Sequence, residues 1–355
     1  MEKRLIMDNF FGYFLIILVV FGVLVFIHEL GHFLTARACG VTVKEFAIGM
    51  GPKLFSWTSK KHNTKYALRL FPIGGFVSMQ NEDGLDEDAD PDDAGSFSNK
   101  SVPKRMLITI AGATMNLLLG FLLMMIIVFA TQNVGSTVIA RFADNATSSE
   151  KLMVDDEILK VGNTRVHTWN ELAYEIMNSG YEPVDITVRR NGEKLVVEDV
   201  VFGTFEDSGA TFGQYDFLPY ADEVTFGNLL KHSFYRSLST VKMVLDSVKG
   251  LLTGRFGMQA VSGPVGVVGV VQDVAKQGFM SFLYIICVLT INLGVFNLIP
   301  FPALDGGRFL FLAIEGVRGK PINKNVESYI NFVGLMILFA FMIFVTFKDI
   351  MNLVF

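Results

Sequence analysis

The chain has 355 residues, of which 51% are hydrophobic and only 18% are charged. Soluble globular proteins carry about a quarter charged residues, so this composition excludes an ordinary soluble enzyme. The formal net charge is −5, but residues 82–93 alone hold eight acidic residues and no basic ones, so the acidity is local. The sequence has no stripe of basic residues with interleaved aromatic residues, so nothing in it indicates a nucleic-acid ligand. The two cysteines, Cys39 and Cys287, supply neither a disulfide framework nor a metal knuckle.

Four apolar runs are each long enough to cross a bilayer, whose hydrocarbon core takes roughly 20 residues of helix. We expect transmembrane helices at residues 9–38, 106–131, 277–307 and 328–350. The first run is longer than the apolar part of a signal peptide and contains His28 and Glu29, which favours a retained span. The sequence therefore predicts an α-helical integral membrane protein with four transmembrane helices.

The orientation follows from the Lys and Arg residues that flank the spans, because cytoplasmic loops carry an excess of them. These residues concentrate between the first two spans, at 39–105, and between the last two. Both segments are therefore expected in the cytoplasm, and the segment between the second and third spans is expected outside.

The cytoplasmic segment 39–105 has two parts. Residues 41–79 are rich in β-branched and aromatic residues, with glycines as punctuation, which predicts short strands or hairpins close to the membrane. The acidic run that follows predicts a mobile, solvated loop.

The outer segment contains a predicted compact α+β domain at residues 133–204. A capping box, Thr168 to Glu171, begins a helix that we expect to end at Gly180. Alternating apolar residues around an Asn191-Gly192 turn predict a hairpin. The next region, 224–260, has one apolar face and predicts an amphipathic helix. This face fits packing on the domain and contact with lipid equally well.

The first span ends in His28-Glu29-Leu30-Gly31-His32. Histidines at i and i+4 lie on one helical face and can bind one metal ion, while the intervening Glu can act as general base. Ionisable groups inside a span are costly and tend to mark function. The pattern therefore predicts a metal site in which His28 and His32 are ligands and Glu29 is catalytic.

A zinc site of this kind needs a third protein ligand. Asp305 follows two prolines and precedes two glycines, which predicts a break in the third helix at membrane depth. Irregular backbone is tolerated there only beside protein or a wet cavity, so we expect Asp305 to complete the site with one Zn²⁺ per chain. A helix cap at the membrane boundary is the alternative role for this residue.

Two paired motifs carry a resemblance to a known family. His28-Glu29-Leu30-Gly31-His32 in the first span and Asn297-x-x-Pro300-x-Pro302-x-Leu304-Asp305-Gly306 in the third resemble the site-2 protease family of intramembrane metalloproteases. More narrowly, the chain resembles the bacterial regulator of sigma-E proteases. Further motifs that fit this subfamily lie at residues 46–52, 71–76 and 97–101, at Ala111-Gly112-x-x-x-Asn116 and at Ser262-Gly263-Pro264-Val265-Gly266.

The resemblance implies zinc bound by His28, His32 and Asp305, with Glu29 as catalytic acid and base. It also implies that Asn297 positions substrate or the developing oxyanion, that Pro300 and Pro302 belong to the substrate region, and that the outer domain is a PDZ domain. The chain has room for one PDZ domain, and Lys151-Leu152 stands where a PDZ loop often has Gly-Leu. That departure puts peptide-terminus binding by the domain in doubt.

The resulting expectation is a multi-pass protein of the bacterial inner membrane that hydrolyses peptide bonds within transmembrane segments. Its substrates would be single-pass proteins, such as anti-sigma factors or signal-peptide remnants, already shortened by another protease. The Gly74-Gly75-Phe76 segment could hold the substrate as an added strand or be a packing turn. A membrane metal-ion transporter and a non-catalytic PDZ scaffold are the alternative functions. The sequence makes no prediction of oligomeric state.

Overall fold

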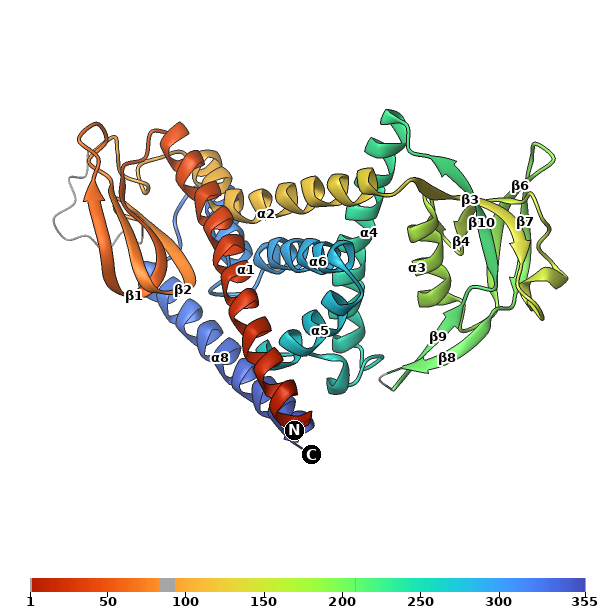
Figure 1. Ribbon diagram of the computed structural model, residues 1–355. Coiled ribbons are helices and arrows are strands. Elements are labelled where there is room, and N and C mark those ends of the chain that lie inside the picture. Colours follow the sequence, from red (N-terminus) through yellow and green to blue (C-terminus); the bar gives the residue numbers. More distant parts are fainter. Residues whose placement is uncertain (1, 83–92, 208, 355) are drawn as a thin grey trace. The chain divides into compact units, whose positions relative to one another are not determined.

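The computed structural model describes residues 2–82, 93–207 and 209–354 (Figure 1). The chain forms two compact units, one made of Met1–Gly120 with Ser262–Phe355 and the other of Phe121–Val261. Residues 83–92, which carry most of the predicted acidic loop, lie outside the described residues.

The first unit is built around long helices. Helices α1, α2, α6 and α8 contain segments that are long and apolar enough to cross a membrane, so the chain is a membrane protein with several apolar helices. The helices and their bounds are α1 (Glu2–Ala38), α2 (Val102–Ala130, which continues into the second unit), α5 (Pro264–Lys276), α6 (Phe279–Leu298), α7 (Asp305–Arg318) and α8 (Lys324–Val354).

The third predicted span is interrupted before residue 307 and is followed by a separate helix. Helix α6 ends at Leu298 and α7 begins at Asp305, with irregular backbone between them. Pro300 and Pro302 have no amide to continue the helix, and Ala303 has a φ of 71°, which turns the chain. Asp305 is therefore in the first turn of α7. Helix α5 was not predicted, and it begins with Pro264 at a position that favours proline.

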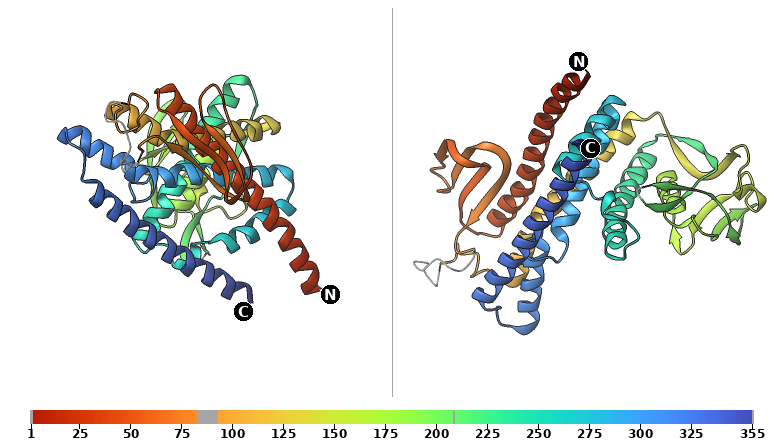
Figure 2. Two further views of the ribbon diagram at one scale, coloured as in Figure 1. Left: turned by 90° about the vertical axis from the view of Figure 1, so that its left-hand side faces the viewer. Right: turned by 90° about the horizontal axis from the view of Figure 1, so that it is seen from below.

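The segment between the first two apolar helices forms two long strands where the sequence predicted short ones. They are β1 (Val43–Thr58) and β2 (Lys65–Met79), and the right-hand view of Figure 2 shows them on one side of α1 with the blue helices of the C-terminal part on the other. Residues 45–48 of β1 pair with 65–68 on one edge and with 75–78 on the other. Among the described residues, 75–79 therefore pair with β1 on one edge only, and the second edge lies near the end of α1.

The second unit contains a six-stranded sheet with the order β10-β3-β4-β6-β7, to which β5 is added beside β4. Its core consists of buried aliphatic and aromatic residues, among them Ile139, Leu172 and Phe217. The strands and helices of this unit are β3 (Asn133–Phe142), β4 (Glu157–Val161), β5 (Thr164–Arg165), α3 (Trp169–Ser179), β6 (Val184–Arg190), β7 (Glu193–Val200), β8 (Gly203–Asp207), β9 (Ala210–Gln214), β10 (Phe217–Glu223) and α4 (Phe226–Leu252).

Two details of this unit bear on the sequence predictions. The Thr168 side chain accepts from the Glu171 amide and Gly180 caps α3, so the predicted capping box is confirmed. The sheet extends beyond the predicted boundary at residue 204, because β10 pairs with β3. This pairing joins strands that are distant in sequence, which no local pattern could indicate.

Helix α4 has the predicted amphipathic character, but its apolar face is not buried on the domain. On that face Phe226, Phe234 and Leu245 are exposed. The helix contacts α3 through polar groups: the Lys242 ammonium lies 2.8 Å from a carboxylate oxygen of Glu175, and the Tyr174 hydroxyl donates to Asp246 at 2.9 Å. Packing on the domain therefore does not account for the apolar face.

Candidate metal centre and active site

Helix α1 brings two histidines together one turn apart. His28 and His32 are each only 9% exposed, and their Nε2 atoms lie 3.2 Å apart. This closeness follows from the i, i+4 spacing, which stacks side chains on one face of a helix.

Asp305 approaches this pair from the start of α7. Its Oδ2 atom lies 3.1 Å from Nε2 of His28 and 3.3 Å from Nε2 of His32. Within the described residues this buried oxygen has no hydrogen-bond donor of proper geometry. A buried carboxylate oxygen without a donor is costly, so its position calls for a cation.

The three ligand atoms fit a zinc ion. Zinc binds imidazole nitrogen and carboxylate oxygen at about 2.0–2.1 Å in tetrahedral geometry, which places ligand atoms about 3.3 Å from one another. The three atoms here lie 3.1–3.3 Å apart. Two neutral imidazoles and one carboxylate are also a donor set that suits zinc.

Gly112 of α2 provides the space for this arrangement. A Cβ atom on this residue would lie 2.3 Å from Nε2 of His32 and 2.7 Å from Nε2 of His28. Any other residue would therefore fill the position that a bound metal needs. A Cβ on Gly31 would similarly lie 2.4 Å from the carbonyl oxygen of Ala111, so the close approach of α1 and α2 depends on glycine in both helices.

The remaining imidazole nitrogens are also held by α2. Nδ1 of His32 lies 2.8 Å from the carbonyl oxygen of Ile108, which accepts its proton and leaves Nε2 free to bind metal. Nδ1 of His28 lies 3.4 Å from the amide nitrogen of Asn116, whose Oδ1 is buried and has no hydrogen-bond partner in the part of the chain that the structure describes. Turning this amide over places Oδ1 as the acceptor for His28 and satisfies the oxygen. Asn116 thus orients the first ligand.

A cavity of about 220 Å³ opens beside the three ligands, and Glu29 lines it together with Phe76 and Val77 of β2. The backbone amide of Val77 interacts with the Glu29 carboxylate. A Cβ on Gly75 would lie 3.3 Å from Cγ of Glu29 and 2.9 Å from the carbonyl oxygen of Ala47, so glycine allows the strand edge to come this close. The remaining lining residues are Met79, Glu82, Thr109 and Arg308.

Other residues that the sequence singled out are not among those that line the cavity. Asn297 donates to the carbonyl oxygen of Leu293 in its own helix, 3.0 Å away. Pro302 packs on α8, where a Cβ on Gly334 would lie 2.5 Å from Cβ of Pro302, and Pro300 is exposed. Gly74 has a φ of 80° and shapes the bend in β2. Asn297 and the two prolines are not in the cavity lining.

Sequence reasoning gave no role to Gly112 and Asn116, although both lie in a motif that it noted. It counted Glu82 only in the acidic run and Arg308 only among the basic residues that flank the spans, and it gave neither residue a role at the site. Asn116 could have been found from the sequence, because it is a polar side chain inside an uncharged span. Burying such a side chain in a membrane is costly unless it has a hydrogen-bond partner.

Comparison with known proteins gives one family. The model of peptidase family M50 matches residues 16–341. The regulator of sigma-W protease RasP of Bacillus subtilis is 30% identical over an alignment that covers 95% of this chain and 97% of the relative. The zinc metalloprotease RasP of Bacillus licheniformis is 30% identical, with 95% and 98% coverage, and that of Shouchella clausii is 29% identical, with 94% and 97% coverage.

Proposed function

This chain belongs to peptidase family M50 and is an intramembrane zinc metalloprotease, and from this premise we propose which of its residues carry the reaction. His28, His32 and Asp305 hold the zinc ion, and Glu29 is the catalytic acid and base. The observation that carries the proposal is the triangle of ligand atoms with sides of 3.1–3.3 Å beside the Glu29 carboxylate.

The reaction needs a water molecule to attack the scissile carbonyl carbon while the carbon–nitrogen bond breaks. A zinc ion supplies Lewis acidity at such a site. The Glu29 carboxylate takes a proton from the attacking water and gives it to the leaving nitrogen, so that a new carboxylate and a new amine result. Ile108 and Asn116 keep both imidazoles in the tautomer that has Nε2 available.

The edge of β2 at residues 75–79 binds the substrate as an added strand. A peptide bond within a helix is shielded by its own hydrogen bonds, so the substrate must be extended before it is cut. This edge pairs with β1 on one side only and its Phe76 and Val77 line the cavity, which supports the interpretation of Gly74-Gly75-Phe76 as a binding segment. Asn297, Pro300 and Pro302 remain a proposed substrate region next to the start of α7.

The arrangement across the membrane is part of the same proposal. The distribution of Lys and Arg places residues 39–105 and the metal centre toward the cytoplasm of a bacterial cell, and the domain built around 133–204 outside. We assign this domain as a single PDZ-like domain that excludes substrates with bulky outer parts. Nζ of Lys151 donates to the carbonyl oxygens of Glu198 and Asp199, at 2.8 and 2.9 Å. The loop that contains Lys151 is therefore already hydrogen-bonded within the domain. The exposed apolar face of α4 lies on lipid.

The substrates are then single-pass membrane proteins that another protease has already shortened, such as anti-sigma factors or signal-peptide remnants. The relative named regulator of sigma-W protease supports the first of these classes.

The test is cleavage of a single-span reporter by the purified protein, with Glu29→Gln compared at matched zinc content. Cleavage by the wild type alone is the expected result. Equal cleavage by both proteins would place the general base elsewhere. If neither protein cuts any reporter although zinc is bound, a scaffold or a metal-ion transporter becomes the better description.

A further inference from the structure

The edge of β2 that faces away from β1 carries two outward backbone amides beside the cavity. The amide of Gln80 donates to the carbonyl oxygen of Thr42, 2.9 Å away, and so points toward β1. Because successive amides of a strand alternate in direction, those of Val77 and Met79 point away from β1. The Val77 amide interacts with Glu29, and the Met79 amide donates to Oε2 of Glu82 at 3.2 Å. The end of the edge is thus already occupied by a carboxylate of the same chain.

Arg308 holds that carboxylate in place. Its Nη1 donates to Oε1 of Glu82, and its Nη2 donates to the Glu82 carbonyl oxygen at 2.9 Å. Arg308 lies one helical turn after Asp305 on α7, and its guanidinium lies 4.9 Å from the ring centre of Phe97. A backbone amide and a guanidinium therefore converge on one carboxylate, which is a strong donor set for an anionic group.

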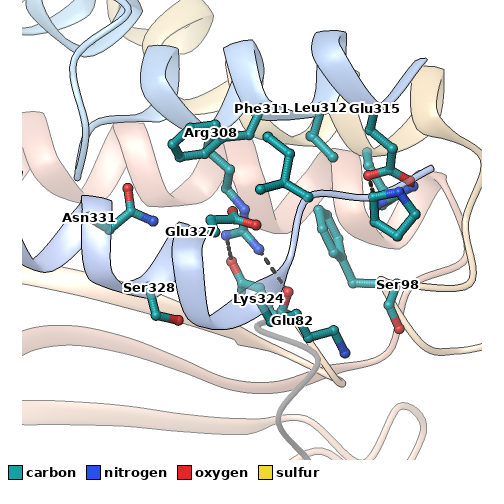
Figure 3. Close-up of a pocket in the computed structure, with 14 residues that line it drawn as sticks. Glu82, Ser98, Arg308, Phe311, Leu312, Glu315, Lys324, Glu327, Ser328 and Asn331 are labelled. Carbon is teal, nitrogen blue, oxygen red and sulfur yellow. Dashed lines mark hydrogen bonds and ion pairs between the residues drawn. The ribbon is translucent and has the colours of Figure 1, made fainter. Parts of the chain in front are cut away.

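Glu82 and Arg308 also stand between two cavities. Both line the cavity that contains the metal ligands, and both line a second cavity of about 300 Å³. Figure 3 shows the second cavity, with dashed lines from Arg308 to Glu82 and with Lys324, Glu327 and Asn331 on its polar wall. The pair is therefore within reach of a molecule bound in either cavity.

A substrate that pairs with the β2 edge must take over the Met79 amide, and Glu82 must then leave. Its departure would remove the carboxylate with which Arg308 forms an ion pair among the described residues, and the loss is costly for this partly buried guanidinium unless another anion replaces it. We propose that Arg308 determines specificity by binding an acidic side chain of the substrate at the position that Glu82 fills in the free enzyme. This inference rests on the proposed function, because it concerns the same cavity and the same strand edge.

The experiment uses pairs of single-span reporters that differ by Glu or Gln at one position. The position moves residue by residue through the segment on the cytoplasmic side of the cleavage site. For at least one position the wild type is expected to cut the Glu reporter with a higher kcat/KM than the Gln reporter. Arg308→Gln is expected to lose that preference while it still binds zinc. Glu82→Gln is expected to lower KM for both reporters, by about tenfold if the subsite is free in about one molecule in ten of the wild type.

A matched control is available on the same helix. Glu315 of α7 forms a similar pair with Arg105, with N–O distances of 2.5 and 3.1 Å, and it is not in the lining of the catalytic cavity. Glu315→Gln is expected to keep the wild-type preference and the wild-type KM. Zinc content and the thermal unfolding midpoint of each variant show that it is folded.

Three results would overturn the inference: equal cleavage of Glu and Gln reporters at every position by the wild type, a preference that persists in Arg308→Gln, or an unchanged or raised KM in Glu82→Gln. These results leave the proposed function intact as long as the wild type cuts and Glu29→Gln does not. Failure of the wild type to cut any reporter would overturn the proposed function, and the inference with it.

Discussion

Gly112 of α2 lies so close to His32 that a Cβ atom on it would stand 2.3 Å from the Nε2 atom of the imidazole. The backbone of one apolar helix thus forms the wall of the metal site on its neighbour. The atoms nearest to this Cβ position belong to two buried imidazoles, and these closely packed rings have little freedom to move away from an added methyl group.

Gly112→Ala is therefore expected to abolish zinc binding and cleavage together. The methyl group would occupy the space at the Nε2 atoms of both histidines, so metal content per chain, measured by elemental analysis of the purified protein, should fall to near zero. Gly269→Ala is the control, because a Cβ there meets nothing within 4 Å. Full zinc content in Gly112→Ala would contradict the placement of the site.

Asn116 is expected to increase the affinity for zinc although it is not itself a ligand. Asn116→Ala removes the acceptor that orients His28, and loss of such an outer partner typically costs about 10–100-fold in metal affinity or activity. Competition with a chelator measures the affinity directly. Asn116→Asp keeps an oxygen acceptor and should retain most of it. Thr114→Ala is a control on the same helix, since its hydroxyl donates to its own helix at Ile110. Equal affinity in Asn116→Ala and the wild type would remove this role.

How far the sequence predicts the site depends on how local each contact is. His28 and His32 are four residues apart on one helix, so the spacing alone places them together. Asp305 was predictable because a carboxylate beside a proline-rich break is rare in a membrane span. Arg308 and Glu82 are separated by 226 residues, and nothing near either residue indicates the other. Their pairing depends on how α7 and β2 pack, which is a tertiary property.

The same distinction between local and long-range contacts explains which parts of the fold the sequence predicts. The apolar runs and the amphipathic periodicity predicted the long helices, and the capping box predicted the start of α3. The extra length of β1 and β2 was not predicted, because glycines and charged residues within them interrupt the alternation that marks a strand. Helix α5 was missed because its start is stabilised by a residue far away in the sequence.

Helix α5 depends on Asp349 near the end of α8. One carboxylate oxygen of Asp349 accepts from the amides of Gly263 and Gly266, both at 2.8 Å. Asp349→Ala would leave two amides at the start of α5 without this partner, so we expect a loss of about 1–3 kcal/mol in the free energy of unfolding. The thermal unfolding midpoint in detergent measures it. Asp273→Ala, which removes an exposed carboxylate from the same helix, should have little effect, and an equal loss in both variants would contradict the capping role.

Low pH is expected to destabilise the second unit through His232 of α4. The side chain is buried, and this burial, together with the nearby charges of Lys231 and Arg236, lowers the pKa of His232 to about 4. In the unfolded chain the pKa returns to about 6.5, so the unfolded state binds the proton more tightly. The stabilising contribution is complete above pH 6.5 and is lost as the pH falls toward 4, by about 1–2 kcal/mol at pH 5. His232→Gln should flatten the fall of the thermal unfolding midpoint between pH 7 and 5, whereas His62→Gln, at an exposed turn, should leave it unchanged. The same slope in wild type and His232→Gln would show that other groups cause the acid sensitivity.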